Sequence, residues 1–105
     1  GQKLDPMKEV LGTLGANGGL HCFINGLLNP GKELVTFEPM FPMYLDHIDL
    51  AGGRLRSVPL NIKDNKWTFN PDDLYNAFSQ PDASVFLFNS PHNPTGKVFT
   101  KQEME

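Results

Sequence analysis

Residues 86–99 read FLFNSPHNPTGKVF, and this stretch joins an apolar run to a segment that cannot form regular structure. The run at residues 84–88 has no polar–apolar alternation, which is typical of a central strand in a parallel sheet with both faces covered. Two prolines follow, Pro91 and Pro94, and each fixes its own φ and favours an extended backbone at the residue before it. The sequence therefore predicts a buried strand followed by a stiff loop that holds Asn93.

Composition limits the classes of protein to which the chain can belong. It has 105 residues, a net charge of −3 and 39% hydrophobic residues, so it carries no basic footprint for nucleic acid. No apolar run approaches the roughly 20 residues that span a bilayer. Cys22 is the single cysteine, which excludes an internal disulfide and a cysteine-based zinc site. We expect one domain, or a piece of one, in a reducing intracellular compartment (cytoplasm or mitochondrion), with no nucleic-acid, membrane or metal partner.

The first third of the chain predicts a strand, a glycine-rich turn and a helix. Residues 9–14 form a short apolar run, a weak strand prediction, and Gly15-Ala16-Asn17-Gly18-Gly19 follows it. Apolar residues then recur with the spacing of an amphipathic helix, whose expected buried stripe is Leu20, Phe23, Ile24, Leu27 and Leu28. At the start of this helix the N–H groups of residues 16–18 would be unpaired, and the helix dipole adds positive charge there. The turn is therefore a candidate phosphate site, although its spacing matches no common nucleotide fingerprint.

The middle of the chain continues the alternation of strands and helices. Residues 33–37 and 54–60 read as strands, and residues 61–66 read as a polar turn. Helical spacing joins the apolar residues Phe41, Tyr44, Leu45 and Ile48, which we expect to be mostly core. We interpret Asp46, His47 and Asp49 as a solvated polar face, because neighbouring positions on a helix do not converge on a metal.

Two further helix starts are clearly signalled. Asn70 followed by Pro71 and two acidic residues is a strong N-terminal signal, with Leu74, Ala77 and Phe78 as the expected buried face. Residues 100–103 have the pattern of a capping box, which predicts another helix close to Glu105. We expect the domain to be incomplete at that point.

Alternating strands and helices predict an α/β fold with a parallel sheet. In such a sheet the loops that follow the strands lie along one edge, where ligands bind. Three loops qualify, at residues 15–19, 38–44 and 89–97. They bring together a helix start suited to an anion, an aromatic ring at Phe41 and a rigidly held Asn93. This combination suits a planar, hydroxylated and phosphorylated aromatic ligand.

The motifs GANGGL, EPMFPMY, AGGR and NSPHNPTGKVF, in this order and spacing, resemble the large domain of class I/II aminotransferases. These are the fold-type I enzymes that use pyridoxal 5′-phosphate (PLP), and the resemblance runs from Glu9 to Glu105. The details are most similar to kynurenine aminotransferase/cysteine-S-conjugate β-lyase (glutamine transaminase K) and to methionine aminotransferases. It implies that residues 1–105 are a segment of a three-layer, mostly parallel large domain. The parent enzymes are homodimers that move an amino group between an amino acid and a 2-oxo acid.

The resemblance also implies roles for individual residues in cofactor and substrate binding. Ala16 and Asn17 at the helix start would hold the PLP phosphate through their backbone N–H groups, with Gly15 as a further cofactor-binding position. Phe41 would stack on the pyridine ring. The remaining implied positions are Asn93 on the ring 3′-hydroxyl and the substrate carboxylate, Asn89 as a second polar contact, and Tyr44 in the pocket wall. One departure from the family is that Asn17 stands where close relatives often have Tyr.

The resemblance places the catalytic residues outside this chain. The Schiff-base lysine, the aspartate that pairs with the pyridinium nitrogen and the arginine that binds the substrate carboxylate would all lie beyond Glu105. Lys97 matches a non-catalytic position, so we expect the isolated chain to be inactive. Two alternatives remain: a non-catalytic structural or binding remnant of the same fold within an assembly, and a nucleotide-binding α/β domain.

Overall fold

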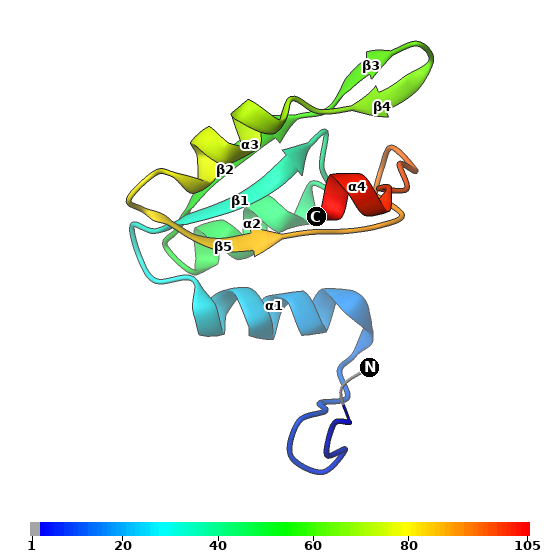
Figure 1. Ribbon diagram of the computed structural model, residues 1–105. Helices are drawn as coiled ribbons and strands as arrows, with labels where there is room; N and C mark the ends of the chain where they lie inside the picture. The colour runs from blue at the N-terminus through cyan, green and yellow to red at the C-terminus, as the bar shows by residue number, and fades with distance from the viewer. Residues whose placement is uncertain (1–2) are drawn as a thin grey trace.

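A computed structural model describes residues 3–105, which form a parallel three-stranded sheet, four helices and a small hairpin (Figure 1). In chain order the elements are α1 (Gly15–Leu27), β1 (Glu33–Glu38), α2 (Met43–Leu50), β2 (Arg54–Pro59), β3 (Asn61–Lys63), β4 (Lys66–Thr68), α3 (Pro71–Phe78), β5 (Ala83–Leu87) and α4 (Lys101–Met104). The strand order is β2-β1-β5, and β1 pairs in parallel with both neighbours. The predicted α/β class and parallel sheet are confirmed.

The central strand β1 is buried on both faces, which explains its continuous apolar sequence. Successive side chains of a strand point to opposite faces, so Leu34 and Val35 enter different cores. On one face Leu34 joins Val85 of β5 and residues of α1 and α2, namely Ile24, Leu28 and Ile48. On the other face Val35 and Phe37 join residues from β2, α3 and the later loops, namely Val58, Leu60, Ala77 and Phe99. The fold therefore has three layers, with the sheet in the middle.

The start of the chain differs from the sequence prediction. Residues 9–14 form no strand and are exposed, and α1 already begins at Gly15 instead of after the glycine-rich turn. The run is too short to pair alone, and no described strand lies beside it. The predicted apolar stripe is also only partly core, because Ile24 is fully buried while Phe23 and Leu27 are 54% and 51% exposed. The sheet therefore covers only part of the apolar face of α1.

The AGGR motif has a packing explanation. Gly52 has a φ of +67°, a left-handed conformation that an L side chain rarely adopts. A Cβ at Gly53 would collide with the side chain of Leu28 at the end of α1. These two glycines let the chain turn from α2 into β2 while α1 lies close against the turn.

The region between β2 and α3 contains a hairpin that the sequence reading treated as a polar turn. Strands β3 and β4 pair in an antiparallel manner, and Asp64 and Asn65 between them have φ values of 51° and 58°. Positive φ at both central residues is typical of a type I′ turn, which suits Asp and Asn. Trp67 in β4 and Phe69 just after the hairpin pack against the core as expected.

Both predicted helix caps are present. The side chain of Asn70 accepts a hydrogen bond of 3.1 Å from the Asp72 N–H at the start of α3. Thr100 and Glu103 form a capping box at the start of α4. In the buried face of α3, Ala77 is core, Leu74 is half-buried and Phe78 is 45% exposed. No helix within residues 3–105 has the length and apolar character needed to cross a membrane.

Candidate cofactor site at the carboxyl edge of the sheet

The three loops singled out in the sequence lie at one edge of the sheet. Strands β1 and β5 are parallel neighbours, so their carboxyl ends meet at the same edge. The loop at residues 39–42 follows β1, and the loop at residues 88–100 follows β5. Helix α1 runs in the opposite direction to the strands, which brings its first turn to this edge as well (Figure 1).

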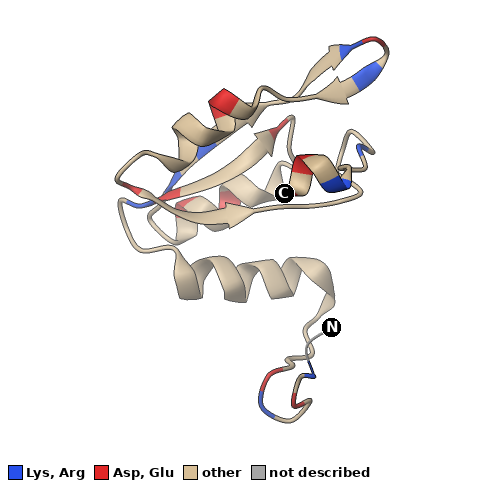
Figure 2. Ribbon diagram, viewed as in Figure 1, with Lys and Arg blue, Asp and Glu red and all other residues tan. Residues whose placement is uncertain are grey.

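The first turn of α1 is open to an anion. Leu14 precedes the helix and provides no side-chain cap, and Gly15, Ala16 and Asn17 are exposed. The N–H of Gly15 donates to the carbonyl of Thr13 at 2.9 Å. The whole helix lacks charged residues (Figure 2), so nothing on it compensates the partial positive charge at its amino end. This turn can therefore hold a phosphate group through its N–H groups.

Asn17 is joined to α2 by its side chain. The Oδ1 atom of Asn17 lies 2.9 Å from Nε2 of His47. We predicted that His47 belongs to a solvated face, and this is wrong, because its side chain is only 7% exposed. Its spacing of three residues from the buried Tyr44 places both on one face of α2, a signal that could have revealed it. Among residues 3–105, no group of three His, Cys, Asp or Glu could hold a metal ion.

Phe41 and Tyr44 form an aromatic pair where β1 leads into α2. Their rings meet edge to face, with centroids 5.7 Å apart and an interplanar angle of 75°. Tyr44 is 5% exposed, and burial raises the pKa of its phenol. Phe41 is half-buried, so part of its ring remains accessible. Tyr44 thus holds the Phe41 ring in one orientation at the edge of the sheet.

The loop after β5 brings two asparagines to the same edge. The hydroxyl of Thr36 in β1 donates to the carbonyl of Leu87 at 2.9 Å, which joins the ends of the two strands. Two residues further on, the Oδ1 atom of Asn89 is buried and has no hydrogen-bond partner among the described residues. Asn93 is exposed. A buried acceptor without a partner is costly, and one in a native structure calls for an explanation such as a ligand.

His92 braces the loop that carries Asn93. Its N–H donates to the carbonyl of Lys97 at 2.8 Å, and the N–H of Gly96 donates back to the carbonyl of His92 at 2.7 Å. The His92 ring is 5% exposed, and its Nδ1 lies 2.8 Å from the hydroxyl of Thr95. Burial lowers the pKa of this imidazole. The sequence reading attributed the stiffness of the loop to prolines alone and missed this contribution.

Lys97 is engaged away from the edge. Its ammonium donates to Oε1 of Glu103 at 2.6 Å and to the carbonyl of Trp67 at 2.8 Å, and it lies 4.7 Å from the centroid of the Phe99 ring. The side chain is 7% exposed. These contacts give Lys97 a structural role, which agrees with its assignment to a non-catalytic position.

Comparison with known proteins decides the family. Residues 1–105 match the family model described as aminotransferase class I and II. The chain belongs to this family. Rat kynurenine–oxoglutarate transaminase 3 is 36% identical over 112 residues, which cover 99% of this chain and 24% of the rat protein. The structure of N-succinyldiaminopimelate aminotransferase from Mycobacterium tuberculosis matches with a TM-score of 0.90 and 35% identity, over 95% of this chain and 26% of that chain.

A third relative has a similar fold over most of this chain. The aromatic aminotransferase of Pyrococcus horikoshii OT3 matches with a TM-score of 0.84 and 32% identity, over 95% of this chain and 26% of that chain. The present chain thus spans about a quarter of the length of these aminotransferases. Its fold is that of part of the fold-type I large domain, and the resemblance seen in the motifs is confirmed.

Proposed function

We propose that this chain forms one wall of the PLP site of a transaminase that moves an amino group between an amino acid and a 2-oxo acid. The observation that carries the proposal is the buried Oδ1 atom of Asn89, which has no partner among the described residues at the edge where Phe41 and the open turn of α1 also lie. The residues present fit PLP, because they offer donors for a phosphate, an aromatic face and side-chain amides for ring substituents. Bound PLP supplies an electron sink for reactions at the amino-acid α-carbon.

Each residue suits its proposed role chemically. The N–H groups of Ala16 and Asn17 donate to the phosphate, and the helix dipole favours the negative charge. Gly15 lies beside them, with its own N–H bonded to the carbonyl of Thr13. The ring of Phe41 packs on the pyridine, with Tyr44 behind it in the pocket wall. The remaining polar contacts come from the loop after β5, where Asn93 serves the 3′-hydroxyl and the substrate carboxylate and Asn89 lies beside the ring. Side-chain amides donate hydrogen bonds without titrating, so these contacts persist across neutral pH.

The amino donor we propose is kynurenine, glutamine, methionine or another aromatic or sulfur-containing amino acid, in line with the kynurenine transaminase relatives. The covalent lysine, the aspartate on the ring nitrogen and the arginine for the substrate carboxylate come from other parts of the parent polypeptide. The active form is a homodimer. Residues 1–105 bind and orient within this assembly, and Lys97 takes no part in the chemistry.

The test is covalent mapping on the parent polypeptide. After incubation with PLP and reduction with borohydride, peptide mass spectrometry should find the adduct on a lysine outside residues 1–105. The Asn93→Ala variant should bind PLP about tenfold more weakly, since it loses a hydrogen bond to a charged oxygen. A stable adduct on Lys97 with turnover would overturn the proposal.

A second candidate is a non-catalytic remnant that uses the same fold for binding or assembly. The engagement of Lys97 by Glu103 and Trp67 leaves no accessible amine at this loop, which is compatible with both candidates. The two candidates differ in one result. A remnant leaves the absorbance of PLP unchanged and transfers no amino group. The transaminase, as the parent polypeptide, changes the absorbance of PLP and transfers an amino group.

A further inference from the structure

The contact between Asn17 and His47 joins the first turn of α1 to the middle of α2. His47 is buried, with 7% of its surface exposed, and its ring packs against the ring of His21 with centroids 5.4 Å apart and an interplanar angle of 62°. Its Nε2 atom lies 2.9 Å from Oδ1 of Asn17. Asn17 itself is exposed. A rigid, buried ring thus contacts a side chain that is otherwise free to turn.

The chemistry of the two groups sets the direction of this hydrogen bond. An amide oxygen only accepts, so Nε2 of His47 carries the proton and donates it. The other ring nitrogen, Nδ1, is buried without a partner among the described residues. The ring therefore contributes one fixed donor, aimed at the oxygen of Asn17.

Occupying that oxygen changes what Asn17 offers to a ligand. A free side-chain amide presents an acceptor or a donor by turning about its last torsion. With Oδ1 held by His47, the amide presents its Nδ2 donors, and within residues 3–105 these make no hydrogen bond to the protein. They lie in the first turn of a helix that carries no charged residue. An anion at this turn would meet donors only.

We propose that His47 is a positioning residue that holds the Asn17 amide with its Nδ2 donors toward the phosphate of the cofactor. The inference rests on the proposed PLP site and adds a side-chain contact to the backbone donors of α1. It also explains how Asn serves at a position where relatives often have Tyr, since the orientation comes from α2.

The experiment compares the affinities of the parent polypeptide for PLP and for pyridoxal, which lacks the phosphate. The His47→Phe variant keeps an aromatic ring but loses the donor. We expect its dissociation constant for PLP to rise about tenfold, as for a lost hydrogen bond to a charged group, and that for pyridoxal to change less than about twofold. If His47 has a purely structural role, the substitution should raise the dissociation constants for PLP and for pyridoxal by the same factor.

A mutant cycle supplies the control. In an Asn17→Ala background the His47→Phe change should have no further effect on the preference for PLP over pyridoxal, because the amide that it positions is gone. If the His47→Phe variant does not fold, Asn17→Asp is the alternative test variant, because residue 17 is exposed. It turns an anionic oxygen toward the phosphate and should reduce the preference for PLP more than tenfold, by about 1.4 kcal/mol or more.

The outcomes separate this inference from the proposed function. If the wild type binds neither ligand, the proposed PLP site is overturned, and the proposed role of His47 is overturned as well. If the wild type prefers PLP and both His47→Phe and Asn17→Asp keep that preference, the role of His47 alone is overturned. The role of His47 is supported if His47→Phe reduces the preference for PLP over pyridoxal in the wild-type background but has no further effect in the Asn17→Ala background.

Discussion

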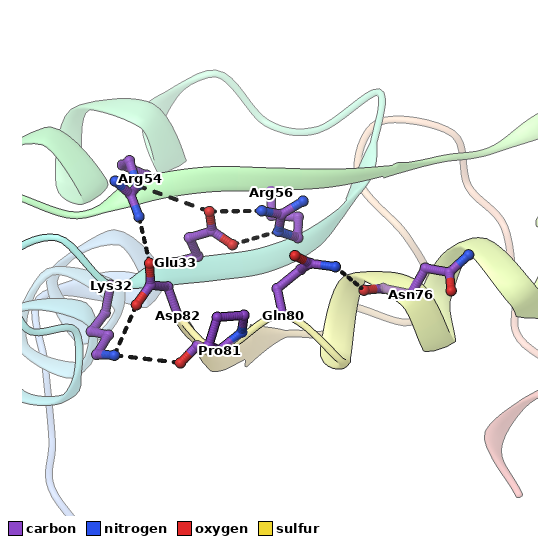
Figure 3. A network of polar contacts seen from close by, with 8 residues as sticks. All are labelled: Lys32, Glu33, Arg54, Arg56, Asn76, Gln80, Pro81 and Asp82. Atoms are coloured by element: carbon purple, nitrogen blue, oxygen red, sulfur yellow. Dashed lines mark hydrogen bonds and ion pairs between the residues drawn. The ribbon is translucent and has the colours of Figure 1, made fainter.

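The two ends of the parallel sheet differ in whether their polar groups have partners. At the amino edge a network of ion pairs joins residues of β1, β2 and the turn before β5 (Figure 3). The carboxylate of Glu33, on a 9% exposed side chain, receives two hydrogen bonds from Arg56 and lies 3.9 Å from Arg54. Asp82 pairs with Lys32 at 3.0 Å and with Arg54 at 2.9 Å. Every charge in this network has a partner from the chain itself.

The carboxyl edge leaves polar groups open. Oδ1 of Asn89 and Nδ1 of His47 are buried without partners among the described residues, and α1 begins without a side-chain cap. Buried polar atoms are nearly always satisfied in native structures, so exceptions concentrated at one edge indicate a ligand. The same sheet is thus stabilised by ion pairs at one end, and at the other end we propose that it binds a ligand.

The largest effect we expect is on stability, from Glu33→Ala at the amino edge. Removing the carboxylate leaves the half-buried Arg56 without its partner, which should lower the free energy of unfolding by more than the loss of a fully exposed pair does. Urea denaturation of the wild type and the variant measures it. The exposed pair Lys101–Glu105, at 3.4 Å, is the matched control, and Lys101→Ala should cost less than about 0.5 kcal/mol. Equal losses in the two variants would contradict the contrast between buried and surface pairs.

The second prediction has the opposite sign and concerns the carboxyl edge. Asn89→Leu removes a buried acceptor that has no partner, so the unliganded protein should unfold with a free energy unchanged or higher by about 1 kcal/mol. The same variant should bind PLP about tenfold more weakly. Thermal unfolding without ligand and titration with PLP give the two quantities. If the variant is destabilised without ligand, Asn89 stabilises the fold, and the proposed difference between the two edges is contradicted.

The smallest effect we expect is a difference in acid sensitivity. Burial lowers the pKa of His92 from its ordinary value of 6.5, so its contribution to stability is complete above that pH and is lost as the pH falls through the folded-state pKa. Hydrogen bonds from Arg56 lower the pKa of Glu33 from 4.5, so the amino edge loses stability only below pH 4.5.

Hydrogen exchange can follow the two edges separately. The amide of Gly96, bonded to His92, should lose protection at a higher pH than the amide of Arg54, bonded to Lys32. His92→Gln should remove the early loss and leave the later one. If Arg54 loses protection first, the assigned order of the two edges is incorrect.

Much of the fold could be read from local patterns. The unalternating run at β1, the Asn70 cap and the Thr100 capping box each depend on residues within a few positions of one another. The run at residues 84–88 also forms a strand, but the prediction of a central strand covered on both faces is wrong, because β5 lies at the edge of the described sheet and Phe86 and Phe88 are 37% and 40% exposed. The alternation of strands and helices then predicted which loops share an edge. Phe41 and Asn93 were found in this way. Their roles toward PLP stay predictions.

Other features depended on contacts that no local pattern contains. Asn17 and His47 are 30 residues apart, and only the packing of α2 on α1 brings them together. The exposure of Phe23 and Leu27 in α1 likewise reflects how much of the helix the sheet covers. The sequence by itself determined most of the helices and strands, the caps of α3 and α4 and the parallel character of the sheet, because periodicity and turn chemistry are local. Only the tertiary structure decided which polar groups found partners and which remained open, because each pairing joins elements distant in the chain.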